Sequence, residues 1–262
     1  MPRPIVTLTT DFGLTDHFTG VMKAVILKIC PSAEIVDISH QVNQFEVTEG
    51  AFLISQAFPY FPKKTVHVVV VDPGVGSARR PILVEAAGQY LIGPDNGVLS
   101  MVYSREKAKV REITAEKFWL QPVSRTFHGR DIFAPSGAHL AKDGAPARFG
   151  KLIEDYLRIG FQKPSRMSKR AWMGTILKID HFGNLITNFH VNDFPEIRER
   201  AFEMSVGIQK VHRLALHYAD AGPNEVCVIA GSSGYLEVSV NQGSAARILG
   251  CGTGAPVELS LY

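Results

Sequence analysis

Three aspartates in this sequence follow apolar runs and stand beside glycines. Asp11 lies in TTDFG, Asp72 in VDPGVG and Asp180 in IDHFGN. Aspartate is common in turns, so one such residue says little, but three of them spread over both halves of the chain are less easily dismissed. A carboxylate that accepts hydrogen bonds from two adjacent hydroxyls is a common way to bind ribose. We therefore expect at least one of the three to bind a sugar diol.

Positive charge and a titratable ring are also available in the sequence. Arg79 and Arg80 follow Asp72 closely enough for a side chain to fold back over it, and we expect Arg80 to remain a surface residue. His128, in FHGRD, lies in a polar glycine turn before an expected helix, which makes it the best candidate among nine histidines for a titrating or hydrogen-bonding group. A structural turn with surface arginines and a structural histidine is the alternative, and the residues alone leave both open.

Several familiar motifs are absent from the sequence. There is no Walker lysine followed by Ser or Thr, no G-x-G-x-x-G and no G-x-S-x-G elbow. The histidines show no paired metal-ligand spacing. Cys30, Cys227 and Cys251 are scattered, which argues against a zinc site or a disulfide scaffold and for a reducing compartment. We expect a small-molecule binder that uses Asp, Arg and His side chains and needs neither metal nor cofactor.

The composition excludes other classes of protein. The 262 residues are 45% hydrophobic and 20% charged, as in ordinary soluble globular proteins, and suffice for one large domain or two modest ones. A net charge of +3 without a basic stripe does not favour nucleic-acid binding. No stretch reaches the roughly 18 apolar residues of a membrane span, and no cleavage site follows the start. We expect a cytoplasmic protein without nucleic-acid or membrane partners.

Strands and helices alternate through the first part of the chain. Residues 68–71 are an unbroken valine run, typical of a strand buried on both faces, and the Pro and Gly residues after Asp72 end it. Asp72 would then lie at the carboxyl end of a central strand, where open α/β sheets bind ligands. The alternation predicts an α/β domain over 1–160, with a largely parallel sheet flanked by helices. Expected strands are 5–9, 34–38, 66–71, 82–86 and 90–92; expected helices are 18–29, capped by Thr15 or Asp16, 47–58 and 99–103.

The pattern changes after the polar stretch FQKPSRMSK. We interpret residues 161–170 as a linker between domains. Beyond it, strand-like periods without a long amphipathic helix predict a smaller all-β, barrel-like domain over 171–262. Its expected strands are 173–179, 185–189, 213–218, 226–230, 235–240 and 257–261.

With these residues laid out, the chain resembles the S-adenosyl-L-methionine (SAM) hydroxide adenosyltransferases, or SAM hydrolases, relatives of the fluorinases and chlorinases. The resemblance covers nearly the whole chain and runs in order through TTDFG, VTEGA, VDPGVG, GPDNG, TFHGRD, IDHFGN and SGYLE. It implies hydrolysis of SAM to adenosine and L-methionine, and a homotrimer whose active sites lie between the first domain of one subunit and the second domain of its neighbour. Halide adenosylation and non-catalytic binding of adenosine or SAM remain alternatives.

The resemblance also implies roles for individual residues. The hydrolytic branch of the family carries an Asp–Arg–His set that the halogenating enzymes lack, and its matches here are Asp72, Arg79 and His128. These residues would position and activate the water that attacks ribose C5′. Ser233 departs from the fluorinase pattern, which has arginine there beside the match to Ser232. Substrate positions carried over are Asp11 on the ribose diol, Asp180 and Asn184 around the methionine end and adenine, Ser232 near the methionine carboxylate, Phe45, Phe182 and Tyr218 as aromatic walls, and Asp16, Glu237 and the backbone near Val240.

Overall fold

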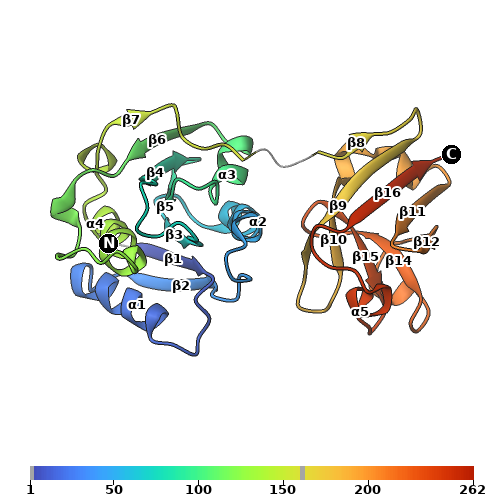
Figure 1. Ribbon diagram of the computed structural model, residues 1–262, viewed down its shortest axis with the longest axis horizontal. Helices are drawn as coiled ribbons and strands as arrows, with labels where there is room; N and C mark the ends of the chain where they lie inside the picture. The colour runs from blue at the N-terminus through green and yellow to red at the C-terminus, as the bar shows by residue number, and fades with distance from the viewer. Residues whose placement is uncertain (1–2, 160–162) are drawn as a thin grey trace. The chain divides into compact units, whose positions relative to one another are not determined.

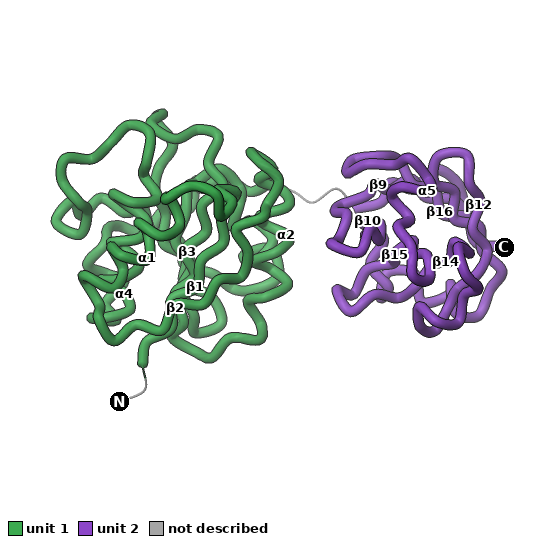
Figure 2. The backbone as a smooth tube through the Cα atoms, turned by 90° about the horizontal axis from the view of Figure 1, so that it is seen from below, with its two compact units in different colours: residues 1–160 green, residues 161–262 purple. Residues whose placement is uncertain are grey.

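The chain forms two compact units, Met1–Gly160 and Phe161–Tyr262 (Figure 2). The computed structural model describes residues 3–159 and 163–262. The first two positions of the linker expected at 161–170 lie outside the described residues. Within the same range, β8 (Ser165–Arg166) pairs with β9 (Ala171–Ile179), so these two residues belong to the sheet of the second unit.

Unit 1 is built on one mixed sheet with the strand order β2-β1-β3-β5-β4-β6-β7 (Figure 1). The strands β2, β1, β3 and β5 are parallel, which confirms the α/β architecture predicted from the alternation of strands and helices. The remaining pairs, β5–β4, β4–β6 and β6–β7, are antiparallel, and a tight turn at Ala87–Gly88 reverses the chain between β4 and β5. The strands are β1 (Ile5–Thr10), β2 (Glu34–Ser39), β3 (Val66–Val70), β4 (Pro81–Ala86), β5 (Gln89–Pro94), β6 (Ala108–Glu112) and β7 (Leu152–Ile153).

The central strand β3 is buried on both faces, as the valine run predicts. Val66, Val68 and Val70 belong to one apolar core with α1 and α4, whereas Val69 and Val71 belong to another with α2 and α3. Successive side chains of a strand point to opposite faces, so one valine run supplies both cores. Figure 1 shows the two helix pairs on opposite sides of the sheet. The helices are α1 (Phe18–Ile29), α2 (Val47–Ala57), α3 (Ser100–Arg105) and α4 (Ala134–Asp143).

The start of α1 differs from the prediction. His17 is the N-cap residue and makes no capping hydrogen bond through its side chain, so the expected cap at Thr15 or Asp16 is wrong. The side chains of residues 14–17 are exposed in the turn that follows β1. Preference of Asp and Thr for N-caps is a local tendency, and here the tertiary path of the turn overrides it.

The turn after β3 is fastened to neighbouring segments. The side chain of Asn96, from the GPDNG turn, donates to the carbonyl of Val71 at 2.8 Å. Gly76 has φ +78°, in the left-handed region, and a Cβ there would overlap the carbonyl oxygen of Arg125. Only glycine meets both requirements, so this turn packs directly against the backbone that leads to His128.

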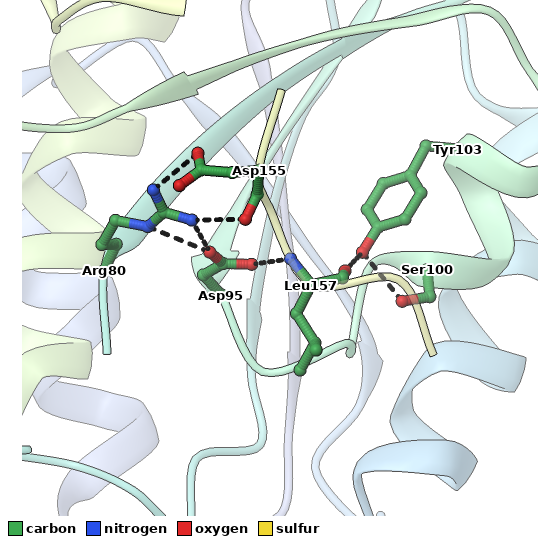
Figure 3. Close-up of polar contacts among 6 residues, drawn as sticks. All are labelled: Arg80, Asp95, Ser100, Tyr103, Asp155 and Leu157. Carbon is green, nitrogen blue, oxygen red and sulfur yellow. Dashed lines mark hydrogen bonds and ion pairs between the residues drawn. The ribbon is translucent and has the colours of Figure 1, made fainter. Parts of the chain in front are cut away.

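Arg80 is an ion-pair centre rather than a free surface residue (Figure 3). Its guanidinium contacts the carboxylates of Asp95 at 2.8 Å and Asp155 at 2.9 Å, and it donates to the Asp155 carbonyl. Asp95 also accepts from the backbone N–H of Leu157 at 2.8 Å, and the hydroxyl of Tyr103 donates to the Leu157 carbonyl. These bonds hold the last residues of unit 1 against the ends of β4, β5 and α3.

Unit 2 is a curled sheet with the order β12-β11-β16-β9-β10-β15-β14-β13, with β8 paired to β9. The sheet curls around a large apolar core, and a smaller apolar cluster lies beside β13 and β14. The predicted all-β, barrel-like character is confirmed. The expected strand at 213–218 shrinks to β13, since Tyr218–Asp220 form a 3-10 turn. The short elements β11, β12 and α5 were not predicted. The remaining elements are β10 (Leu185–His190), β11 (Phe202–Val206), β12 (Gln209–Val211), β13 (Leu214–Ala215), β14 (Val226–Ala230), β15 (Tyr235–Val240), α5 (Ala245–Leu249) and β16 (Pro256–Leu261).

A buried histidine lies inside the unit 1 sheet. His67, on β3, is fully buried; its Nδ1 lies 2.7 Å from the Thr7 hydroxyl and its Nε2 lies 2.8 Å from the Gln89 side-chain oxygen. Because the amide oxygen only accepts, Nε2 carries the proton of the neutral ring. Burial lowers the pKa of His67 to about 4, and the bond to Gln89 opposes that shift.

We predict that unit 1 loses stability as the pH falls from 6.5 towards 4. The pKa of His67 falls from 6.5 to about 4 on folding, so the unfolded chain binds more protons in that window, and acidification favours unfolding by about 3 kcal/mol. Urea unfolding at several pH values measures this slope for the wild type and for His67→Gln, which keeps the other histidines. Equal slopes in the two proteins would contradict the assignment.

Candidate active site

The predicted Asp–Arg–His set is assembled in unit 1. Asp72 follows β3, and the turn after it returns Arg79 to its carboxylate: Arg79 Nε donates to Asp72 Oδ1 at 2.9 Å, and Nη2 pairs with Oδ2. Nη2 also lies 2.7 Å from Nδ1 of His128, which precedes the π-helical turn Gly129–Phe133. The structure thus brings His128 to a pair, Asp72 and Arg79, that lies about 50 residues earlier in the sequence.

The guanidinium of Arg79 is buried, and one of its nitrogens has no hydrogen-bond partner among the described residues. The side chains of Arg79 and Asp72 are 9% and 4% exposed, and the Arg79 guanidinium lies over the ring of Phe133 at 5.2 Å. Among the described residues, Nη1 of Arg79 has no hydrogen-bond partner although it is buried. A buried N–H group without a partner is costly, so this nitrogen is a donor that a water or ligand oxygen would satisfy.

The protonation state of His128 follows from its contact with Arg79. A guanidinium can only donate, so Nδ1 of His128 accepts from Arg79 and the neutral ring carries its proton on Nε2. The pKa of His128 is lowered, first by burial and then by the positive charge of Arg79. The charges of Asp72 and Asp131 and hydrogen bonding to the Ser124 backbone act in the opposite direction. The ring is therefore neutral near pH 7.

Asp11 lies at the same edge of the sheet. It directly follows β1, which pairs in parallel with β3, so Asp11 and Asp72 leave the sheet side by side. Asp11 Oδ2 accepts from the backbone N–H of Phe45 at 3.0 Å. The pKa of Asp11 is raised, mainly by burial and also by the charge of Asp72. Asp11 therefore adds a second carboxylate at the edge of the sheet where Asp72 lies.

Phe45 is an exposed aromatic ring on an unusual backbone. Its φ is +68° and its side chain is 68% exposed. A bulky residue in the left-handed region is strained by about 1–3 kcal/mol, and such strain is concentrated at ligand sites. The bond from Asp11 helps hold this conformation, so Asp11 and Phe45 act as one structural feature.

Unit 2 contains a cavity of about 780 Å³. Its Asp180 carboxylate organises the IDHFGN loop: Oδ1 accepts from the backbone N–H groups of Phe182 and Asn184, and Oδ2 accepts from the Asn184 side chain at 2.8 Å. The Phe182 ring is 75% exposed. The residues lining the cavity are Asp180, Phe182, Asn184, Ile186, Tyr218, Ser232, Ser233, Glu237, Val240, Gln242, Gly243, Ser244 and Arg247.

A second carboxylate lies in the same cavity. Glu237 on β15 is only 5% exposed, accepts from the Tyr218 hydroxyl at 3.2 Å and from Ser233 at 3.4 Å, and leaves no room for a Cβ on Gly231. Burial raises the pKa of Glu237, and the charge of Asp180 adds to this effect. Burial also raises the pKa of Tyr218 to about 12. The cavity thus combines acidic oxygens with two partly exposed aromatic rings.

The predicted site residues fall into two groups, one at the edge of the unit 1 sheet and one at the unit 2 cavity. Seven of them line the cavity of unit 2, whereas Asp11, Phe45 and the Asp–Arg–His set lie in unit 1. Asp16 is exposed, in the turn between β1 and α1. Sequence reasoning missed Phe133 under Arg79, and also Arg247 on α5 at the cavity. Phe133 lies five residues beyond His128 in the same dense stretch, which was the only available signal.

The described residues contain neither a cluster of metal-ligating side chains nor a membrane-spanning helix. Within residues 3–159 and 163–262, no group of three or more His, Cys, Asp or Glu side chains is arranged to hold a metal ion. In the same part of the chain, no helix has the length and apolar character to cross a membrane.

Curated relatives match nearly the whole chain. It is 35% identical over 257 residues to an (R)-S-adenosyl-L-methionine hydrolase of Salinispora tropica, covering 95% of both chains. A protein of the same name from Methanocaldococcus jannaschii is 35% identical and covers 94% of this chain and 91% of its own. A fluorinase from Actinoplanes sp. is 30% identical and covers 91% of each chain.

Solved structures and family models agree with these relatives. A crystal structure of an uncharacterized conserved protein from Thermotoga maritima superposes with a TM-score of 0.90 at 36% identity, covering 98% of this chain and 99% of the other. Residues 6–150 match the SAM hydroxide adenosyltransferase N-terminal domain, and residues 174–258 match the C-terminal domain. With both domains matched in order, the chain belongs to the SAM hydroxide adenosyltransferase family.

Proposed function

We propose that this protein hydrolyses SAM to adenosine and L-methionine. The observation that carries the proposal is the unpartnered Nη1 of Arg79, a buried cationic donor held in place by Asp72 and His128. The curated relatives named as hydrolases share 35% of their residues with this chain, whereas the Actinoplanes fluorinase shares 30%. The higher identity to the hydrolases supports hydrolysis rather than halide transfer.

The chemistry of SAM explains why such a donor suffices. The leaving group is a sulfonium, so the C5′–S bond breaks with its electrons going to sulfur and yields a neutral thioether, which needs no general acid. The site must supply an oxygen nucleophile aligned with C5′ and shielded from bulk water. A fixed guanidinium stabilises the negative charge that develops on the attacking oxygen. Arg79 would hold the water through Nη1 while C5′–O bond formation displaces methionine.

The proton of the water needs an acceptor. Nδ1 of His128 is occupied by Arg79 and its Nε2 carries the ring proton, so His128 would accept only after releasing the guanidinium. Each carboxylate oxygen of Asp72 retains a lone pair beyond the one it uses for Arg79. We therefore propose Asp72 as the acceptor and His128 as the residue that orients Arg79.

The other predicted residues would bind the substrate. Asp11 would accept from the ribose hydroxyls, with Phe45 as an aromatic wall. The unit 2 cavity, with its two carboxylates and two aromatic rings, suits a ligand with a sulfonium, an ammonium and a purine, because cations are attracted to both carboxylates and aromatic faces. These contacts would come from residues that line the cavity: Asp180, Phe182, Asn184, Tyr218, Ser232, Glu237 and the Val240 backbone. Asp16 stays a substrate contact that the family resemblance implies.

We further propose a homotrimer in which each active site combines residues of two subunits, as the family resemblance implies. Neither unit by itself carries both the Asp–Arg–His set and the large cavity. We propose that catalysis needs no cofactor or metal, because the residues assigned above account for the step. The three cysteines form no disulfide with one another, which supports the expected cytoplasmic location.

Two alternative functions can be distinguished from hydrolysis by experiment. A halide adenosyltransferase would form 5′-halo-adenosine in chloride or fluoride, which mass spectrometry detects. A binding protein would retain SAM or adenosine tightly and return the ligand unchanged after long incubation. Neither explains a buried guanidinium with one free donor as directly as hydrolysis does.

The first prediction concerns activity. Purified protein should convert SAM to adenosine and methionine, measured by chromatography against a heat-killed control. Arg79→Lys keeps the charge but cannot bond Asp72, His128 and a water together, so we expect kcat to fall about 10²–10³-fold. Arg148→Lys, which changes an exposed ion pair with Asp143, is the matched control and should retain activity. Absence of adenosine in the wild type would overturn the proposal.

The second prediction separates chemistry from binding. His128→Ala and Asp72→Asn should abolish most turnover and leave the affinity for SAM within a few-fold, because neither residue is assigned to recognition. Isothermal titration calorimetry measures the affinity, and chromatography measures the turnover. Loss of binding in parallel with turnover would move these residues to substrate recognition.

The third prediction tests the shared site. Asp72→Asn impairs the set in unit 1 and Glu237→Gln impairs the cavity in unit 2. If the two halves of a site come from different subunits, co-expressed chains form mixed trimers that contain an intact pair, and activity returns in part. Activity no higher than that of the parent variants would show that each site is built from a single chain.

A further inference from the structure

Asp131 is a buried carboxylate that the proposed chemistry does not use. It lies three residues after His128 in the π-helical turn and is 2% exposed. Its Oδ1 accepts from Arg130 Nε at 2.6 Å and its Oδ2 accepts from Arg130 Nη2 at 2.9 Å. Burying a carboxylate is costly unless its oxygens accept hydrogen bonds, and the bonds from Arg130 offset part of that cost. They do not explain why a carboxylate lies at this point of the turn.

Asp131 also fastens the segment that leads to His128. Its Oδ2 accepts from the backbone N–H of Ser124 at 2.8 Å, and its carbonyl accepts from the backbone N–H of Leu120 at 2.9 Å. The Ser124 hydroxyl oxygen in turn accepts from the Thr126 N–H at 3.1 Å. One residue therefore ties both ends of the segment 120–124 to the turn that carries the histidine.

Segment 120–124 continues into Arg125, and together they lie beside the turn that presents Arg79 and the turn that follows His128. The carbonyl of Arg125 lies so close to Gly76 that no side chain fits there, and Gly76 belongs to the turn that presents Arg79. Phe127, the residue before His128, accepts from the backbone N–H groups of Arg130 and Asp131 at 3.2 and 3.1 Å, so the same turn fixes the backbone of His128. The Ser124 backbone also raises the pKa of His128, against the lowering by burial. A displacement of Ser124 and Arg125 would thus reach the His128 ring from one side and the Arg79 turn from the other.

We propose that Asp131 is a positioning residue for the reaction: by holding Ser124, it fixes the His128 ring against Arg79 and so aims the free nitrogen of Arg79. Its carboxylate bonds to Arg130 and to the backbone N–H of Ser124. The kinetic part of this inference rests on the proposed hydrolysis, whereas the structural part concerns the His128 ring alone.

Asp131→Ala removes the anchor, and Asp131→Asn keeps an oxygen that can accept from Ser124. Since a misplacement of about 1 Å can cost about 10²-fold, we expect kcat to fall 10- to 100-fold for Asp131→Ala and less for Asp131→Asn. KM and the calorimetric affinity for SAM should stay within about twofold. Asp143→Asn, at the end of α4, is the control and should change neither constant. A rise in KM with unchanged kcat would overturn the proposal.

A double mutant tests whether Asp131 acts through His128. In the His128→Ala background, Asp131→Ala should lower the residual turnover by less than about twofold, because residues that act as a unit are not additive. A purely structural role would multiply the two losses and overturn the proposal. If Asp131→Ala does not fold, Asp131→Asn takes its place in the same cycle.

A spectroscopic measurement is independent of turnover. With ¹⁵N-labelled histidine, Nδ1 of His128 should resonate in the wild type as an unprotonated nitrogen that accepts a hydrogen bond, and Asp131→Asn should shift this signal towards that of an unbonded nitrogen. The measurement is made well above the titration range of the ring, because the charge of Asp131 itself raises the pKa of His128. An unchanged His128 signal would overturn the positioning role even if SAM is hydrolysed. A shifted signal in a protein that fails to hydrolyse SAM would sustain the positioning role and refute only the proposed function.

Discussion

The carboxylate of Asp72 and the guanidinium of Arg79 meet where both are almost fully removed from water. Moving two ions out of water costs several kcal/mol for each, and their attraction offsets this cost only when geometry and remaining hydrogen bonds are good. Much of unit 1 serves that geometry. The buried strand β3 ends at the carboxylate, Asn96 holds the strand end, and Gly76 allows the turn to lie against the backbone of Arg125.

The position of Asp72 was predictable because a single physical pattern determines it. Four successive valines require burial on both faces, and a Pro–Gly sequence cannot continue the strand. The same reasoning places Asp11 beside it, since parallel neighbours end at the same edge. The start of α1 was not predictable from capping preference, because His17 takes a place that local chemistry assigns to Thr15 or Asp16.

Interactions between distant segments mark the limit of sequence reasoning. The role of Arg80 depends on Asp155, whose distance along the chain gives no local signal. The strands β11 and β12 are short, with a two-residue connection, and their buried residues alternate with polar ones too briefly to be distinguished from a loop. The same holds for the Asp131–Ser124 bond, since nothing in TFHGRD indicates which backbone group its last residue would bind.

The backbone of Phe45 has a consequence for protein engineering. A phenylalanine at φ +68° is less stable there than glycine would be, because glycine adopts this conformation without steric cost. A screen that selects for thermostability would thus favour glycine at position 45 and discard the exposed ring beside Asp11. If Phe45 forms an aromatic wall for the substrate, as proposed above, melting temperature and turnover would move in opposite directions at this one position, so variant libraries of this protein should be scored on turnover as well as heat resistance.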